Sequence, residues 1–165
     1  MPGVDASCCD TRFMLGQGWQ SQWERVGRRL EDVRRVYAGA PGGTDVAIDK
    51  VLSFFETVHA LRDWLWNDPA SGVTKDNVHT LIDSSPVLQV CADVANGSKH
   101  FELTSSQTGD LSTTIARNDV AVFVGKGTSA HRFYIASSGT ERDLLKVAEE
   151  AVAEWRRFLS RRHLI

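Results

Sequence analysis

Residues 93–100 bring four kinds of functional group into about two turns of an expected helix. Asp93 carries a carboxylate, Asn96 an amide, Lys99 a cation and His100 an imidazole. At about 100° per residue, Asp93, Asn96 and His100 form one narrow stripe, and Lys99 lies beside it. An imidazole can move protons near neutral pH, and a neighbouring cation can stabilise developing negative charge. This segment is therefore the first candidate for a catalytic site.

His59 and Asp63 form a second pair whose side-chain types are suited to catalysis. They are four residues apart, so they share one face of an expected helix. A carboxylate next to an imidazole orients the ring for general acid–base catalysis. Antiparallel packing of the two helices would bring this pair close to Asn96 and His100. The candidate catalytic set is then His100, Asn96, Lys99, His59, Asp63 and Asp93.

The same side chains allow a metal site as an alternative. Imidazole and carboxylate ligands on facing helices suit iron, manganese or zinc. The candidate ligands are His59, Asp63 and His100, with Asp93 or Glu56. The sequence lacks the second Glu-x-x-His motif of a di-iron bundle, and it has no P-loop, dinucleotide fingerprint or G-x-S-x-G motif. We therefore predict no resident metal and no cofactor.

A purely structural role is the alternative to both sites. Every amphipathic helix has a polar face opposite its apolar face, so a polar stripe is not by itself a site. Gly97 lowers the stability of a helix interior by about 1 kcal/mol relative to alanine. Its presence favours the close approach of a ligand, another backbone or a neighbouring helix at this point.

Helical and extended patterns indicate the elements that must position these residues. Five helices are expected, over residues 19–38, 44–66, 75–82, 85–100 and 140–165. Residues 101–104, 119–124 and 131–135 have the character of extended segments, and Gly125-Lys126-Gly127 favours a hairpin between the last two. The sequence thus predicts a mainly α fold, a bundle of about five helices with a β-hairpin inserted before the last helix.

One domain is expected from the length of 165 residues. Residues 1–16 lack periodicity and contain Pro, Gly, Ser and Asp, which predicts a loosely ordered N-terminal segment. Residues 17–165 are expected to form the single helical-bundle domain, with the β insertion at residues 101–137.

The charge distribution is uneven although the net charge is only −2. Arginines cluster in residues 25–35 and 156–162, and such faces either contact phosphate or are the solvated sides of helices. Three cysteines without zinc-site spacing suit the reducing cytoplasm. No apolar run approaches about 18 residues. We therefore expect a cytoplasmic protein without a membrane partner.

Residues 95–100, Ala-Asn-Gly-Ser-Lys-His, resemble the Arg-Asn-x-x-x-His signature of the HEPN superfamily. These are small helical bundles found in prokaryotic toxin–antitoxin and phage-defence systems. The resemblance implies metal-independent RNA cleavage in a dimer, with proton transfer by His100 and a supporting role for Asn96. Ala95 stands where the signature has arginine, and Lys99 is the cation on the same stripe. Residues 59–65 and 93–100 also resemble segments of small bacterial proteins, a resemblance that implies no activity.

The resemblance predicts a bacterial HEPN-like protein that binds or cleaves RNA as a homodimer. The tryptophans support a different function, a non-catalytic module for dimerisation or for binding a protein partner. Trp64 and Trp66 lie on different faces of one expected helix, so the two rings cannot both point into the same core. Tryptophan is enriched at protein interfaces.

Overall fold

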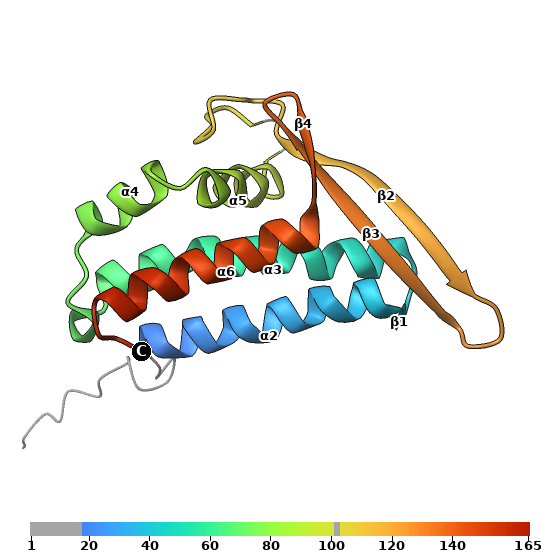
Figure 1. Ribbon diagram of the computed structural model, residues 1–165, viewed down its shortest axis with the longest axis horizontal. Helices are drawn as coiled ribbons and strands as arrows, with labels where there is room; N and C mark the ends of the chain where they lie inside the picture. The colour runs from blue at the N-terminus through green and yellow to red at the C-terminus, as the bar shows by residue number, and fades with distance from the viewer. Residues whose placement is uncertain (1–17, 101–102) are drawn as a thin grey trace, which may run out of the picture.

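The computed structural model describes residues 18–100 and 103–165. The expectations of a loosely ordered segment over residues 1–16 and of extended structure at residues 101 and 102 lie outside the described residues. In the described part, α2 (Trp19–Ala38), α3 (Thr44–Asn67) and α6 (Leu144–Arg161) lie along one another (Figure 1). The shorter helices α4 (Lys75–Asp83) and α5 (Pro86–Gly97) pack on α3 and α6, on the side away from α2. A 3₁₀ turn, η1 (Pro69–Ser71), follows α3.

Apolar side chains at helical spacing hold these helices together. Val51, Phe54, Phe55, Val58 and Leu61 of α3 are all fully buried, as expected for a central helix with a wide apolar face. No helix in the described ranges is both long enough and apolar enough to cross a membrane.

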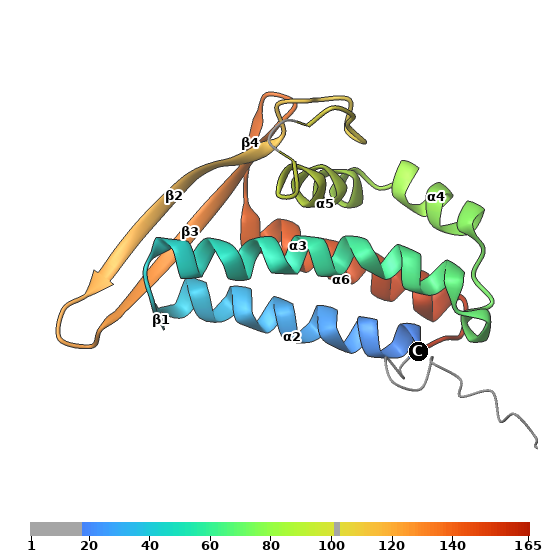
Figure 2. The same ribbon diagram turned by 180° about the vertical axis from the view of Figure 1, so that it is seen from behind.

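Four antiparallel strands complete the fold. They are β1 (Ala40–Pro41), β2 (Thr114–Phe123), β3 (Thr128–Ser137) and β4 (Thr140–Asp143). β3 pairs with β2 along one edge and with β1 and β4 along the other. β2 pairs only with β3, so its second edge is free among the described residues. Both views show the β2–β3 hairpin projecting past the connection between α2 and α3 (Figure 2).

The prediction of a mainly α bundle with an inserted hairpin is wrong. The described residues are 59% helical, in five helices, and 18% strand, in one four-stranded antiparallel sheet, so the fold is mixed α/β. The strands missed by the prediction are the shortest ones. Ala40–Pro41 lies in a Gly-rich connection, and Thr140–Asp143 has the spacing of a helix cap rather than an alternating pattern.

Two helix boundaries also differ from the prediction. The last helix begins at Leu144, because the Asp143 carboxylate accepts hydrogen bonds from the backbone N–H groups of Leu145 and Lys146 and caps the helix there. Helix α5 ends at Gly97 rather than at His100. The candidate residues Lys99 and His100 therefore lie beyond the helix.

Candidate binding cleft beside helix α5

The C-terminal end of α5 is tied to the middle of α3. The Ser98 hydroxyl donates to Glu56 Oε1 at 2.7 Å and lies 2.9 Å from the carbonyl oxygen of Ala95. The antiparallel approach expected for these two helices thus brings Glu56 to the end of α5. Ala95 is fully buried, so the position at which the HEPN signature has arginine faces the core.

Asp93 is fully buried and holds the loop that follows α5. Its carboxylate accepts hydrogen bonds from the hydroxyl of Ser106 at 2.6 Å and the backbone N–H of Gln107 at 2.6 Å. It also accepts from the backbone N–H and the hydroxyl of Thr108, at 3.1 and 2.6 Å. A buried carboxylate needs such donors to replace the water it has lost. Asp93 therefore positions residues 103–113 rather than facing a ligand.

A relay of hydroxyl groups continues from this loop to the sheet. Thr108 Oγ1 lies 3.3 Å from Thr113 Oγ1, which lies 2.8 Å from Ser137 Oγ of β3. Asp110 accepts from the backbone N–H groups of Ser112 and Ser138, and from the Ser112 hydroxyl. These hydrogen bonds, those from Ser112 foremost, lower the pKa of Asp110. The loop thus connects α5 firmly to β3.

His59 is buried and uncharged near neutral pH. Desolvation lowers its pKa to about 3, and the charges of Arg62 and Lys99 act in the same direction against the opposing charge of Asp93. Its Nε2 atom has no hydrogen-bond partner among the described residues. A ring with so low a pKa is a poor proton acceptor at neutral pH. We therefore assign His59 no role in acid–base catalysis.

Asp63 of α3 is paired with its neighbour in the chain. It forms an ion pair with the adjacent Arg62 at 3.4 Å, and its side chain is half exposed. Within the described residues, no group of three His, Cys, Asp or Glu side chains is placed to hold a metal ion. The alternative metal site of His59, Asp63 and His100, with Asp93 or Glu56, is thus not assembled.

His100 and the end of α5 border an open cleft of about 690 Å³. The cleft lies where α3, α5, the 103–113 loop and the start of β2 meet. Its lining has an apolar part, Ile48, Leu52, Val94, Leu103, Leu111 and Ile115, and a polar part, Gly97, Ser98, His100, Ser112, Thr113 and Thr114. Of the sequence candidates, only His100 lines it; Asn96 is half-buried on α5, and Lys99 is exposed.

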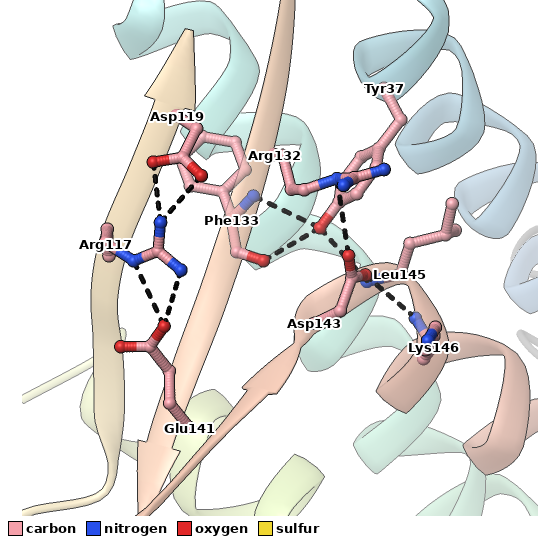
Figure 3. A network of polar contacts seen from close by, with 9 residues as sticks. All are labelled: Tyr37, Arg117, Asp119, Arg132, Phe133, Glu141, Asp143, Leu145 and Lys146. Atoms are coloured by element: carbon pink, nitrogen blue, oxygen red, sulfur yellow. Dashed lines mark hydrogen bonds and ion pairs between the residues drawn. The ribbon is translucent and has the colours of Figure 1, made fainter.

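Tyr37 of α2 fixes strand β3 of the hairpin to the helices (Figure 3). Its hydroxyl lies 2.9 Å from the carbonyl oxygen of Phe133, to which it donates, and it accepts from the backbone N–H groups of Phe133 and Leu145. Burial is the main cause that raises its pKa to about 12. One side chain of α2 thereby positions both β3 and the start of α6.

Arg117 of β2 is fully occupied within the chain. Its guanidinium donates to Asp119 and Glu141 (Figure 3). It also stacks over the ring of Tyr134 at 3.6 Å. The hydrogen bonds to Glu141 are the first cause of the raised pKa of Arg117. The part of the hairpin around Arg117 thus carries charged side chains that pair with one another.

The distal half of β2 has the opposite character. Residues 120–123 of β2 and Val124, the first residue of the following turn, carry no charge, and the side chains of Val122 and Val124 are 70% and 96% exposed. Val120 and Phe123 are also exposed. Sequence reasoning recognised this strand but missed its free edge. The available signal was an uncharged, β-branched run directly before the Gly125-Lys126-Gly127 turn.

The tryptophans and arginines are largely engaged within the chain. Arg25 lies over the Trp64 ring at 5.7 Å, and Arg62 and Lys75 lie over the Trp66 ring at 5.7 and 5.5 Å. Within the two arginine clusters, the pairs with carboxylates are Arg28 with Glu24, Arg29 with Asp32, Arg34 with Glu149, Arg35 with Glu31 and Arg157 with Glu154. Much of the first arginine cluster therefore consists of self-paired helix faces.

The structure leaves His100 on the cleft rim, Asp93 and His59 in the interior, and Asp63 half exposed beside Arg62. No protein-family model, curated protein or solved structure matches this chain. The HEPN resemblance accordingly stays a prediction, and the function has to be argued from the cleft and the strand beside it.

Proposed function

We propose that this protein is an interaction module that binds an extended, apolar polypeptide segment along the free edge of β2. The observation that carries the proposal is the uncharged, exposed run at residues 120–123, at the end of β2, whose second edge has no partner strand among the described residues. A free strand edge offers a row of backbone donors and acceptors to a further strand. Backbone pairing supplies the affinity in this kind of recognition, and pockets for side chains supply the specificity.

The cleft supports the proposal because it begins where β2 begins. Thr114 and Ile115 belong to β2 and also line the cleft. A segment paired along β2 would reach the cleft at the base of the hairpin. There its side chains would meet Leu52 and Leu111 and the hydroxyl groups of the 103–113 loop. Apolar side chains beside hydroxyl groups that fix orientation are typical of ligand recognition.

A labelled synthetic peptide of alternating valine and threonine, with a lysine at each end, tests the proposal. We expect the full-length protein to bind it with a micromolar Kd, measured by fluorescence anisotropy. Val122→Lys should weaken binding at least about tenfold, because it places a charge on the apolar edge, a change of about 1.4 kcal/mol. The matched control is Arg28→Lys, at an exposed site on α2, which should bind as the unaltered protein does.

Two results would contradict this function. One is equal binding by the unaltered protein and Val122→Lys. The other is that the valine–threonine peptide fails to bind, just as a version with proline at alternate positions fails. The proline version is the non-binding reference, since proline cannot pair along a strand. Leu111→Asp, at an exposed cleft position, tests the contribution of the cleft separately.

Action on RNA is the second candidate function. It is favoured by one observation, the exposed imidazole of His100 on the cleft rim with the exposed cation of Lys99 next to it. An imidazole and a cation are the minimum for transesterification of RNA. In this candidate His100 transfers the proton, Lys99 stabilises charge on the phosphate, and Asn96 has a supporting role.

Incubation of the pure protein with a mixed RNA pool tests this candidate. Cleavage is expected to persist in EDTA and to be lost in His100→Ala, because His100 is exposed and its removal leaves the core intact. His79→Ala, at an exposed histidine on α4, is the matched control and should cleave normally. Equal cleavage by both variants, or no cleavage by any protein, would exclude the nuclease.

A further inference from the structure

We infer that the groove between α4 and the C-terminal end of α6 binds the phosphate backbone of a single-stranded nucleic acid. The groove has a volume of about 510 Å³, and Thr80 and Ser84 of α4 face Arg161 and Arg162 across it. It lies at the end of the helices away from the β2–β3 hairpin (Figure 1, Figure 2). The inference therefore goes beyond the peptide-binding function and is independent of it.

The C-terminal part of α6 carries positive charge that the chain itself does not neutralise. Residues 155–165 contain four arginines and no aspartate or glutamate. The glutamates earlier in the helix are each paired with an arginine, in the pairs Glu149–Arg34, Glu150–Arg142 and Glu154–Arg157. Arg156, Arg161 and Arg162 pair with no carboxylate of the described residues. Three exposed guanidinium groups thus remain available to an anion.

Both walls of the groove hold hydrogen-bond donors. Arg162 lies over the ring of Phe158 at 4.7 Å, and stacking of this kind leaves the N–H groups at the edge of the guanidinium plane. Arg161 uses only its Nε atom, which donates to the carbonyl oxygen of Arg157 at 3.3 Å. The Thr80 hydroxyl on α4 has no hydrogen-bond partner within the described ranges. Guanidinium and hydroxyl groups are the donors through which proteins bind the phosphates and sugars of nucleic acids.

The positive surface is longer than a single phosphate group. A second hollow of about 510 Å³ is lined by Arg156, Arg157, Ser160 and Arg161, so Arg161 belongs to both hollows. Arg156 and Arg162 are about 9 Å apart along the helix axis. A strand with regularly spaced phosphates can contact both hollows, whereas one phosphate can contact only one of them.

The size and polarity of the hollows favour a single strand. Each hollow has the volume of a site for one small ligand, so it admits a nucleotide of a flexible strand but not a duplex. Neutral hydroxyl groups, those of Thr80, Ser84 and Ser160, lie among the arginines. A nucleic-acid strand likewise alternates charged phosphates with neutral sugars and bases. The carboxylates of α4, Asp76 and Asp83, do not line the groove.

Binding of a labelled oligodeoxythymidylate to the full chain, measured by fluorescence anisotropy, tests the inference. This probe lacks the 2′-hydroxyl group, so it is not cleaved by transesterification, and its binding is measured apart from any action on RNA. Three arginine–phosphate contacts predict that log K falls with log salt concentration at a slope of about −2. Arg161→Gln with Arg162→Gln should weaken binding at least about tenfold and reduce the slope to about −0.7.

The matched control is Arg28→Gln with Arg29→Gln. It removes the same charge from α2, where both arginines are paired with carboxylates, and it should bind as the unaltered protein does. Thr80→Val changes no charge and should weaken binding about fivefold, the loss of one hydrogen bond, at an unchanged salt slope. Circular dichroism checks that each variant is folded. Arg161→Lys with Arg162→Lys, which keeps the charge at the helix end, should bind with intermediate affinity.

Three results would overturn the inference. The first is the absence of binding at low salt, or equal losses in the α6 and α2 variants, because general charge would then explain the affinity. The second is an unchanged affinity of Thr80→Val, because the groove wall on α4 would then take no part. The third is displacement of the oligonucleotide by poly-glutamate at an equal concentration of charge, which would indicate an acidic protein as the partner instead.

Discussion

His59 of α3 is almost completely buried, and this burial holds its pKa at about 3. In the unfolded chain a histidine titrates near pH 6.5. Below that pH the unfolded state takes up a proton that the folded state does not bind. The stability that depends on an uncharged His59 is therefore fully present above about pH 6.5. It is lost as the pH falls towards the folded-state pKa of about 3.

The different pKa of His59 in the folded and unfolded states makes the free energy of unfolding measurably dependent on pH. Between about pH 6 and pH 4, His59 should lower the free energy of unfolding by up to about 1.4 kcal/mol per pH unit. Urea unfolding at several pH values, compared with His59→Gln, isolates the contribution. His79→Gln, at an exposed histidine, should follow the unaltered protein. Parallel pH profiles for the unaltered protein and His59→Gln would contradict the prediction.

The residue types of the site could be predicted from the sequence, but their environments could not. The polar stripe of Asp93, Asn96 and His100 was expected to face one site on the solvent side of a helix. Instead the helix ends at Gly97, and the 103–113 loop covers Asp93. That loop has no periodic pattern, so helical spacing does not reveal that it returns to bury a carboxylate.

At the scale of elements, the 103–113 loop depends on one acceptor on α5. Asp93→Ala would leave the donors of Ser106, Gln107 and Thr108 without their acceptor in the interior. We expect a loss of about 3 kcal/mol in the free energy of unfolding and faster amide hydrogen exchange over residues 103–113. Asp93→Asn keeps an acceptor oxygen and should lose less. Asp83→Ala, at an exposed position, should change stability by less than about 0.5 kcal/mol; a similarly small effect of Asp93→Ala would contradict the prediction.

Long, strongly periodic elements were predictable for a physical reason. Helices α2, α3 and α4 occupy residues 19–38, 44–67 and 75–83, which confirms those expectations within a residue, because each buries a continuous apolar face. Strand β4 was missed because it is short and Thr140 and Asp143 have the spacing of a helix cap. Strand β1 was missed because it is two residues long and pairs with β3, whose residues are distant in sequence from Ala40 and Pro41. Such pairing leaves no local pattern.

For the whole molecule, the helices act as a rigid base from which the hairpin extends. Tyr37 anchors β3 at this base, and the distal part of β2 reaches past the helices. This arrangement separates two tasks in space: the cleft lies at the base, and the apolar edge lies at the tip. The Val122→Lys and Leu111→Asp variants accordingly address different parts of one surface.

The pairing of β3 along both of its edges also has a consequence for the order of folding. Its partners lie at residues 40–41, 114–123 and 140–143, so the sheet is complete only when nearly the whole chain is available. The contacts between α2 and α3 are local by comparison and can form early, whereas closure of long loops slows the formation of distant pairs. During synthesis α2 and α3 would thus pack together before β3 is available. Tyr37 would be among the last side chains of α2 to form its hydrogen bonds.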